Sequence, residues 1–294
     1  MEKNLSRRHF IQRSVVAGIG LTAMKPFSSW ANAANPGMKF GLVTYQWGKD
    51  WDLPTLISNC EKAGFKGVEL RTQHAHGVET SLNALQRTEV KKRFADSSVF
   101  CVGYGSNFEY HSPDPKILRE NIEQTKEYIK LCKDIGAPGI KVKPNNLPKE
   151  IPREKTIAQI AKSLNEVGKF AQEYGQLVRV EIHGTLTQEI PNIRDIFEQV
   201  TEPNVKMCWN SNDPDLNPPG LEANFKSVAK WIGDTTHIRG IKISDYPYDQ
   251  LFSLLNGIKY KGWILVEAST TPDDKMAAMK EQVALFNEMM ANLK

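Results

Sequence analysis

Short apolar stretches alternate with amphipathic stretches along nearly the whole chain, and this alternation constrains the fold more than any other feature. The apolar stretches have the length of β-strands, and the amphipathic ones carry apolar residues at helical spacing. Eight such strand–helix pairs follow one another at intervals of roughly 24–40 residues, without a break in composition. The predicted strands are residues 38–45, 65–71, 98–106, 139–144, 177–186, 204–213, 238–246 and 262–269.

Alternating strands and helices favour a parallel sheet, because parallel neighbours need a crossover connection. Eight units in about 255 residues match an α/β fold, the (β/α)8 TIM barrel. The main alternative is a doubly wound open sheet, which usually carries a glycine-rich phosphate-binding turn after its first strand. Residues 44–51, TYQWGKDW, contain no such turn at that position. We therefore predict one (β/α)8 barrel over residues 36–294.

The first 35 residues stand apart from this series. Arg7 and Arg8 precede an uncharged run of about 11 residues, too short for the ~20-residue helix that crosses a membrane. Residues 31–33, A-N-A, form an A-x-A cleavage pattern. The segment resembles the bacterial twin-arginine signal. This resemblance implies recognition by the twin-arginine export machinery, no stable membrane anchor, and a periplasmic or otherwise exported protein.

Composition excludes several classes of partner and site. The net charge is only +4 and the basic residues are scattered, so we expect no nucleic-acid partner. None of the four cysteines belongs to a C-x-x-C pair, which disfavours a zinc knuckle or a thioredoxin-type site. We expect these thiols to be buried as small apolar groups.

Charged side chains collect near the ends of the predicted strands, where a parallel barrel builds its active site. In the strand 177–186, Arg179, Glu181 and His183 alternate with apolar residues, and Glu267 lies in an otherwise apolar strand. A charge inside a barrel strand is costly unless it is paired or bound to a ligand. Glu181 and Glu267 are therefore the strongest candidates for chemistry.

Other strand-end side chains form a set that we expect to bind substrate. For Lys141 and Lys143 a purely structural role is the alternative, since long lysine side chains also lie along apolar surface. His237 precedes the predicted strand 238–246, so we expect it to face solvent at the opposite rim. The expected substrate-binding set is Glu69, Arg71, His74, His76, Asn107, Lys141, Lys143 and Trp209.

At these strand ends the chain resembles the xylose isomerase-like barrel family, over about residues 38–290. That family includes sugar isomerases, ketose epimerases, inosose dehydratases and type IV apurinic endonucleases. The resemblance implies a divalent metal held by Glu, Asp, His and Glu on strands five to eight. It rests on the segments GFKGVEL, VEIHG, NVKMCWNSND, IRGIKISDY and GWILVEAS.

The implied metal ligands match this chain only in part. Glu181 and Glu267 correspond to the first and last ligands, whereas Asn210 stands where the family has Asp and Lys242 where its HxKD motif has His. In one arrangement Mn, Co, Zn or Mg binds Glu181, Asn210 and Glu267, and His183 or another nearby histidine completes the shell. In the other, Lys242 lies between the two glutamates and replaces the metal, since a protonated lysine cannot be a ligand.

The resemblance implies proton abstraction next to a carbonyl, with Glu181 or Glu267 as base and His183 or His76 as proton shuttle. The residues expected to hold the oxyanion or an anionic group of the substrate are Arg71, Lys141, Lys143 and Lys242. We expect an isomerase or epimerase acting on a small-molecule sugar or keto-sugar. An exported enzyme is unsuited to phosphorylated metabolites, which stay in the cytoplasm. Two alternatives stay open: β-elimination from a 3-keto-glycoside, and a non-catalytic sugar-binding barrel that has lost its metal. The sequence does not indicate an oligomeric state.

Overall fold

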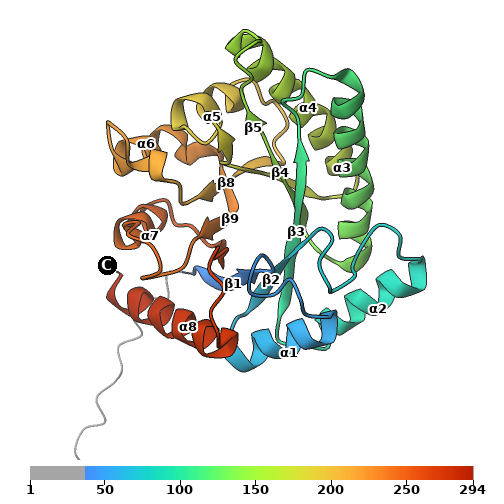
Figure 1. Ribbon diagram of the computed structural model, residues 1–294, viewed down its shortest axis with the longest axis vertical. Helices are drawn as coiled ribbons and strands as arrows, with labels where there is room; N and C mark the ends of the chain where they lie inside the picture. The colour runs from blue at the N-terminus through green and yellow to red at the C-terminus, as the bar shows by residue number, and fades with distance from the viewer. Residues whose placement is uncertain (1–36, 294) are drawn as a thin grey trace, which may run out of the picture. The chain divides into compact units, whose positions relative to one another are not determined.

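Eight parallel strands close into a barrel in the computed structural model, which describes residues 37–293 (Figure 1). The strand order around the barrel is β1-β10-β9-β8-β6-β4-β3-β2, and helices surround the strands on the outside. This arrangement confirms the predicted (β/α)8 TIM barrel. The predicted export signal in residues 1–35 lies outside the described residues.

The strands and helices alternate along the chain with the following bounds. The barrel strands are β1 (Lys39–Val43), β2 (Gly67–Arg71), β3 (Phe100–Glu109), β4 (Gly139–Lys143), β6 (Leu177–Glu181), β8 (Val205–Asn210), β9 (Ile232–Ile238) and β10 (Trp263–Val266). Two-residue strands β5 (Asn145–Asn146) and β7 (Gly184–Thr185) pair beyond the ends of β4 and β6. The helices are α1 (Leu53–Ala63), α2 (Ala84–Ala95), α3 (Pro115–Ile135), α4 (Arg153–Glu173), α5 (Ile190–Phe197), α6 (Leu221–Val228), α7 (Tyr248–Gly257) and α8 (Lys275–Asn292), with 3-10 turns η1 (Asp213–Leu216) and η2 (Ala229–Trp231). None of the helices within residues 37–293 combines the length and apolarity needed to cross a membrane.

Local chemistry fixes where the helices begin and end. The Asp52 side chain accepts a hydrogen bond from the Thr55 N–H and caps the start of α1. Gly64 ends the same helix with a φ of 93°, a left-handed conformation that costs glycine little. Asn83 and Gln86 form a capping box at the start of α2.

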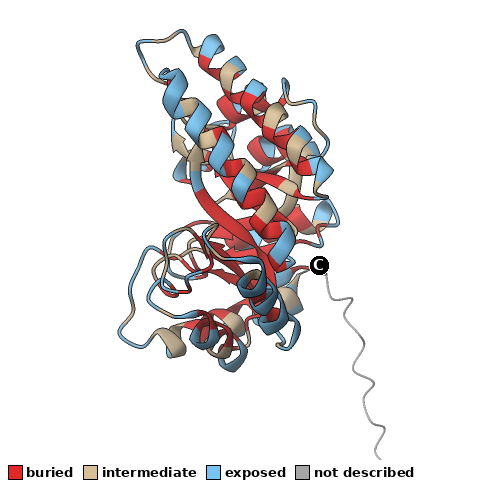
Figure 2. Cartoon of the chain, turned by 90° about the vertical axis from the view of Figure 1, so that its right-hand side faces the viewer, coloured by how far each residue is buried: buried red, intermediate tan, exposed pale blue. Residues whose placement is uncertain are grey.

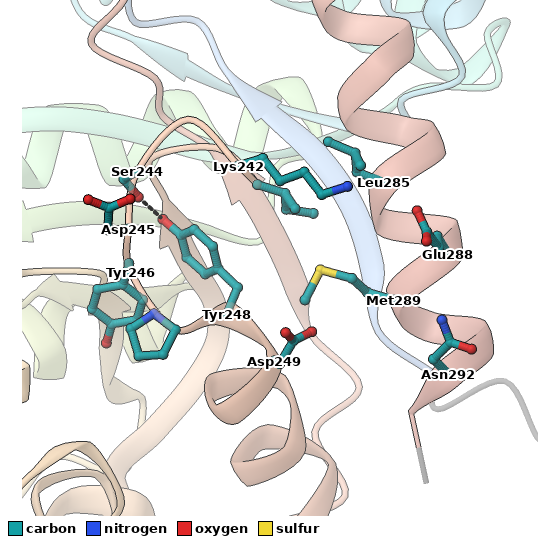
Figure 3. A pocket seen from close by; sticks show the side chains of 12 residues that line it. Lys242, Ser244, Asp245, Tyr246, Tyr248, Asp249, Leu285, Glu288, Met289 and Asn292 are labelled. Atoms are coloured by element: carbon teal, nitrogen blue, oxygen red, sulfur yellow. Dashed lines mark hydrogen bonds between the residues drawn. The ribbon is translucent and has the colours of Figure 1, made fainter.

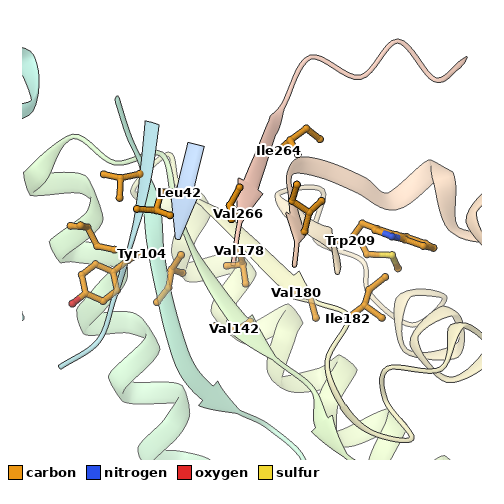
Figure 4. Close-up of a cluster of buried hydrophobic side chains, with 14 of the residues drawn as sticks. Leu42, Tyr104, Val142, Val178, Val180, Ile182, Trp209, Ile264 and Val266 are labelled. Carbon is orange, nitrogen blue, oxygen red and sulfur yellow. The ribbon is translucent and has the colours of Figure 1, made fainter. Parts of the chain in front are cut away.

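The two faces of each barrel strand have different roles. On β6, Val178 and Val180 are fully buried in the main apolar core, which fills the space between strands and helices (Figure 4). The burial map shows the same division, with buried strands inside and exposed positions on the outer sides of the helices (Figure 2). Arg179 and Glu181 face the barrel interior, because successive residues of a strand point to opposite sides. The charged face predicted from the alternation therefore lines the interior.

Glycines on β3 leave room for charged side chains inside the barrel. A Cβ atom on Gly103 would lie 2.1 Å from Nη1 of Arg179, and one on Gly105 would lie 2.6 Å from Oε1 of Glu69. Both contacts are far shorter than van der Waals distance. Residues with side chains at these two positions would displace the charged groups, so the glycines are required by close approach.

The predicted bounds of the seventh strand are wrong. The strand spans Ile232–Ile238 rather than 238–246, and the segment that follows turns at Gly240 (φ 109°) and Lys242 (φ 61°). The spaced isoleucines of that segment mimic strand alternation. The real strand contains Thr235, Thr236 and His237, which are fully buried although polar, so its sequence lacks an apolar pattern.

Candidate active site

Three side chains from three strands converge at the C-terminal end of the barrel. Glu181 ends β6, His237 lies next to the end of β9, and Glu267 directly follows β10. Nδ1 of His237 lies 3.1 Å from Oε2 of Glu267 and 3.7 Å from Oε1 of Glu181. All three side chains are largely or fully buried, with exposed fractions of 12% or less. The convergence of Glu181 and Glu267 agrees with the expectation from their strand positions.

Glu69 lies behind His237, on the side away from the other two glutamates. Nε2 of His237 is 3.3 Å from Oε1 of Glu69, and both residues are fully buried. Beyond this ion-pair contact, neither Glu69 oxygen nor Nε2 of His237 has a hydrogen-bond partner within the described residues. Burial alone would lower the pKa of His237, but Cys208, Glu69 and Glu267 outweigh burial and hold that pKa well above its usual range, so the ring is protonated and its Nδ1 donates to Oε2 of Glu267. With a metal ion on the Nδ1 side, Glu69 would keep the remaining proton on Nε2 and leave the Nδ1 lone pair to the ion. Glu69 therefore orients His237 from behind, and it does not line the cavity of about 250 Å³ that opens onto Glu181 and Glu267.

Cations hold the outer oxygens of the two converging glutamates. Nζ of Lys141 lies 2.5 Å from Oε2 of Glu181, and Nη1 of Arg71 lies 2.6 Å from Oε1 of Glu267. Burial alone would raise the pKa of Glu181, but Lys141 and His237 outweigh burial and hold that pKa well below its usual range. The pKa of Glu267 is likewise lowered, because His237 and Lys141 outweigh burial and the repulsion by Glu181. Both carboxylates are therefore ionised at neutral pH.

A polar cavity of about 250 Å³ opens onto these glutamates. This volume is below the roughly 300–1,000 Å³ of pockets for drug-sized ligands and suits a small polar molecule. Burial, followed by repulsion from Lys141, lowers the pKa of Lys143 to about 8. Burial also lowers the pKa of His183, so its imidazole is neutral at pH 7 and can accept a proton. The lining residues are Tyr45, Arg71, Lys143, Glu181, His183, Gln188, Asn210, Asn212, Arg239, Glu267 and Ser269.

The donor set fits a divalent metal ion. The ligand atoms of Glu181, His237 and Glu267 all lie within 4.8 Å of one another. Two ligands of one ion at ~2.1 Å are about 3.0–3.4 Å apart in octahedral or tetrahedral coordination, close to the contacts that His237 makes here. The otherwise unpartnered Glu69 behind the imidazole is the arrangement typical of a metal-ligating histidine. Two carboxylates and one imidazole suit Mn, Co, Zn or Mg without selecting among them.

Asn210 and His183, both predicted to be possible ligands, line the cavity beside this centre. Nδ2 of Asn210 donates to Oε1 of Glu181 at 3.2 Å, so its side chain reaches the predicted ligand region. Nδ1 of His183 lies 2.9 Å from Oδ1 of Asn145, and the ring lines the cavity. Asn107 accepts hydrogen bonds from Nη2 of Arg71 (2.7 Å) and Nζ of Lys143 (3.2 Å) and links these two cations.

The two histidines after β2 do not line the cavity. His76 is buried, accepts a hydrogen bond from the Val78 N–H through Nδ1, and lies 2.8 Å from the Arg71 carbonyl through Nε2. Both ring nitrogens are thereby used to hold the loop. His74 contacts the Thr44 hydroxyl at 2.9 Å, and burial lowers its pKa to about 4. These contacts give both residues a structural role in place of the predicted contact with substrate.

Two further predicted site residues lie elsewhere. Trp209 is fully buried and packs against Phe225 of α6, because its neighbour Asn210 takes the inward direction on β8. Lys242 is exposed and lines a different cavity of about 360 Å³, between the segment after β9 and α8, near Leu285 (Figure 3). Lys242 therefore does not lie between Glu181 and Glu267, and the predicted replacement of the metal by this lysine is wrong.

His237 was missed as a site residue because strand seven was predicted to begin at residue 238, directly after it, whereas the strand in fact ends there. The expectation that His237 faces solvent at the opposite rim is contradicted by its full burial among three glutamates. The run Thr235–Thr236 with Ile238 carries β-branched residues, and this was the one available sign of a strand ending near His237. With the observed bounds, His237 occupies the place of the histidine that the family resemblance implies on strand seven.

Comparisons with known proteins agree with this fold. The model of the family described as xylose isomerase-like TIM barrel matches residues 57–213, more than half of the chain. A probable ketose 3-epimerase of Synechocystis sp. is 20% identical over 281 residues, which are 88% of this chain and 94% of that protein.

Two solved structures share the fold at low identity. One is 3-keto-D-glucoside 4-epimerase from E. coli, with a TM-score of 0.72, 15% identity, and coverage of 85% of this chain and 99% of the other. The other is the IOLI protein with a bound zinc atom, with a TM-score of 0.70, 17% identity, and coverage of 87% and 97%.

Proposed function

The chain belongs to the xylose isomerase-like TIM barrel family, and we propose that it is a sugar isomerase or epimerase that removes a proton next to a carbonyl group. The observation that carries this proposal is the pair of ionised glutamates, Glu181 and Glu267, that meet at one small polar cavity. An ionised carboxylate facing a substrate carbon can accept the proton directly. The cavity also contains neutral His183, which can take up the proton from the carboxyl group and pass it back to the substrate.

The chain's own residues divide the work of this reaction. Lys141 and Arg71 fix the outer oxygens of Glu181 and Glu267, so the remaining oxygens point toward the shared centre. Glu181, His237 and Glu267 would hold a divalent metal, with Asn210 beside them. When bound, such an ion stabilises negative charge that develops on a carbonyl oxygen. The buried surroundings strengthen each of these electrostatic effects.

Similarity to named proteins supports a sugar substrate. A probable ketose 3-epimerase and a 3-keto-D-glucoside 4-epimerase are both named for a change of configuration on a keto-sugar. Inversion next to a carbonyl and β-elimination from a 3-keto-glycoside begin with the same proton abstraction. We therefore propose a ketose or an oxidised glycoside without phosphate as substrate, and keep elimination as the second candidate reaction.

The test is exchange of substrate protons for deuterium in D₂O, followed by NMR over a panel of ketoses and 3-keto-glucosides. Each sugar is incubated with the full-length chain, with Glu181→Gln and with the control Glu150→Gln, which alters an exposed carboxylate in the loop after β5. We expect exchange with the unaltered protein and the control, and a loss of about 10²- to 10⁴-fold with Glu181→Gln.

The same spectra separate the alternatives. Inverted product indicates epimerase action, and an unsaturated product with a released aglycone indicates elimination. Sugar binding without exchange in any of the three proteins would contradict the enzymatic proposal and favour a non-catalytic sugar-binding barrel.

We also propose that residues 1–35 direct export through the twin-arginine machinery, on the sequence pattern around Arg7 and Arg8. Replacement of both by lysine keeps the charge but removes the paired guanidinium groups. Fractionation of a bacterial host that expresses the full chain is expected to find the protein in the periplasm and the Arg7→Lys, Arg8→Lys double variant in the cytoplasm. Equal distribution of the two proteins would contradict export by this route.

A further inference from the structure

Lys143 differs from every other buried cation in the described part of the chain. Four lysine or arginine residues within residues 37–293 are buried: Arg71, Lys141, Lys143 and Arg179. Arg71 pairs with Glu267, Lys141 with Glu181 and Arg179 with Asp234. Within residues 37–293, Lys143 has no carboxylate in ion-pair contact, and its ammonium donates only to the neutral Asn107 oxygen at 3.2 Å.

This unpaired charge is directed into the substrate cavity. Lys143 is 9% exposed and lines the cavity together with Glu181, Glu267 and Arg71. Its neighbour Lys141, two residues earlier on β4, is fully buried and is held by Glu181. A ligand that reaches the two glutamates therefore meets the Lys143 ammonium.

The amide of Asn107 cannot compensate the charge of Lys143. Its Oδ1 atom is shared with Nη2 of Arg71 at 2.7 Å, so one neutral oxygen serves two cations. A buried charge without a counter-charge in direct contact is costly, and an anionic group of a ligand in the cavity would supply that contact. The missing partner is a single negative charge within the cavity.

Building on the proposed function, we propose that Lys143 binds a carboxylate of the substrate, so that the substrate is a keto-sugar acid rather than a neutral ketose. One ammonium group matches one carboxylate in charge, and the Asn107 amide adds a polar neighbour at the same place. The other cations near the glutamates are already paired, and Arg239 of the cavity wall pairs with exposed Asp213 at 2.9 Å. The arrangement thus favours a monoanion over a phosphate ester, which would need additional donors.

The experiment is calorimetric titration of the full-length chain with matched pairs of ketose and ketouronate: D-fructose with D-fructuronate, and D-tagatose with D-tagaturonate. Ionic strength is constant, because charge interactions weaken with salt. The variants are Lys143→Met, which removes the charge, and Lys143→Arg, which keeps it. The control Lys149→Met removes an exposed lysine from the loop that follows the same strand.

We expect at least one acid to bind 10-fold or more tightly than its neutral partner. Lys143→Met should weaken binding of that acid about 10- to 100-fold, in line with the loss of one charge-assisted hydrogen bond, and weaken binding of the neutral ketose by a clearly smaller factor. Lys143→Arg should retain part of the preference, and Lys149→Met all of it. Equal affinity within both pairs, no binding of either acid, or an equal loss for acid and ketose in Lys143→Met overturns the proposal.

Deuterium exchange on the same samples separates this inference from the proposed function. Exchange with a neutral ketose and no preference for the acid leaves the proposed reaction standing and overturns the role of Lys143. A preference for the acid that depends on Lys143, without exchange in any sugar, supports the role of Lys143 and contradicts the proposed reaction.

Discussion

The two ends of the barrel interior hold charged clusters of opposite character. Toward the N-terminal strand ends, Arg179 of β6 donates to both oxygens of Asp234 at 2.8 and 2.7 Å and to the Val102 carbonyl at 2.8 Å. We call this set the lower cluster. Two residues further along the same strand, Glu181 belongs to the upper cluster, with Glu69, His237 and Glu267.

The difference between the clusters lies in which groups have partners. Nε, Nη1 and Nη2 of Arg179 all donate within the lower cluster, as expected for a buried ion pair that stabilises the fold. The upper cluster leaves both Glu69 oxygens and Nε2 of His237 without hydrogen bonds and opens onto a cavity. One strand, β6, therefore supplies a structural charge, Arg179, and a functional charge, Glu181, two residues apart.

The largest effect is expected from removing an upper carboxylate. Glu267→Gln should lower the deuterium exchange rate about 10²- to 10⁴-fold, because one ionised group of the centre is lost. The free energy of unfolding should fall less than in the lower-cluster variant Arg179→Met, because Arg71 keeps the Asn107 side chain as a hydrogen-bond acceptor. Exchange NMR and urea unfolding measure the two quantities. A variant that unfolds but keeps its rate per folded molecule would contradict the division of roles.

Removing the lower cation should have the reverse effect. Arg179→Met leaves Asp234 and the Val102 carbonyl without their partner, and we expect a loss of about 3 kcal/mol in the free energy of unfolding. Asp234 is about one-third exposed (36%), which keeps the loss at the lower end for a broken buried pair. The surface control Arg153→Met should cost at most about 1 kcal/mol. Urea unfolding gives both values, and a large loss of exchange activity per folded Arg179→Met molecule would show that the clusters are not separate.

A smaller effect is expected from the buried carboxylate behind the histidine. Glu69→Gln replaces the group that favours the proton on Nε2 of His237, so affinity for Mn²⁺ should fall about 10- to 100-fold. Calorimetric titration of metal-stripped protein measures this affinity, with Glu150→Gln as the exposed control. Equal Mn²⁺ affinities of the unaltered chain, Glu69→Gln and Glu150→Gln would contradict a role of Glu69 in metal binding.

The last effect depends on pH and concerns Asp215, a buried acid outside both clusters. Its Oδ2 atom accepts from the Asn212 N–H and the Tyr246 hydroxyl, and burial raises its pKa to about 7. Since the unfolded value is about 3.9, the folded state holds a proton that the unfolded chain has lost between about pH 4 and pH 7. This contribution to stability is complete below pH 4 and is lost as the pH rises through 7.

Asp215→Asn should therefore flatten the stability profile. The difference in unfolding free energy between the variant and the unaltered chain should shift in favour of the variant by up to about 1.4 kcal/mol per pH unit over that range. Urea unfolding at several pH values measures it. Parallel profiles for the two proteins would contradict the raised pKa.

The barrel and its two main glutamates could be predicted from sequence because both depend on local patterns. Eight repeated units specify the fold, and Glu181 and Glu267 stand out within apolar strands. The alternation along β8 also contained the information that Trp209 points outward if Asn210 points inward. The error over Trp209 was therefore avoidable.

The remaining features depend on how deep a side chain lies in the barrel interior and on where each strand begins and ends. Local sequence patterns give neither. Glu69 and Lys143 both belonged to the predicted substrate set, yet the first lies behind His237 and the second lines the cavity. His237 was missed because buried Thr235 and Thr236 conceal a strand whose inner face is polar. The pairing of β9 with β10 places His237 opposite Leu265, and this register is a tertiary property.

Titration of the metal-stripped full-length chain with Mn²⁺, followed by electron paramagnetic resonance, tests the central claim most directly. That claim is that His237 joins Glu181 and Glu267 in one functional centre, while Lys242 lies outside it. We predict one bound ion per chain, at least 10-fold weaker binding in His237→Gln, and unchanged binding in Lys242→Gln. Absence of binding to the unaltered chain, or equal binding in His237→Gln, would contradict the account.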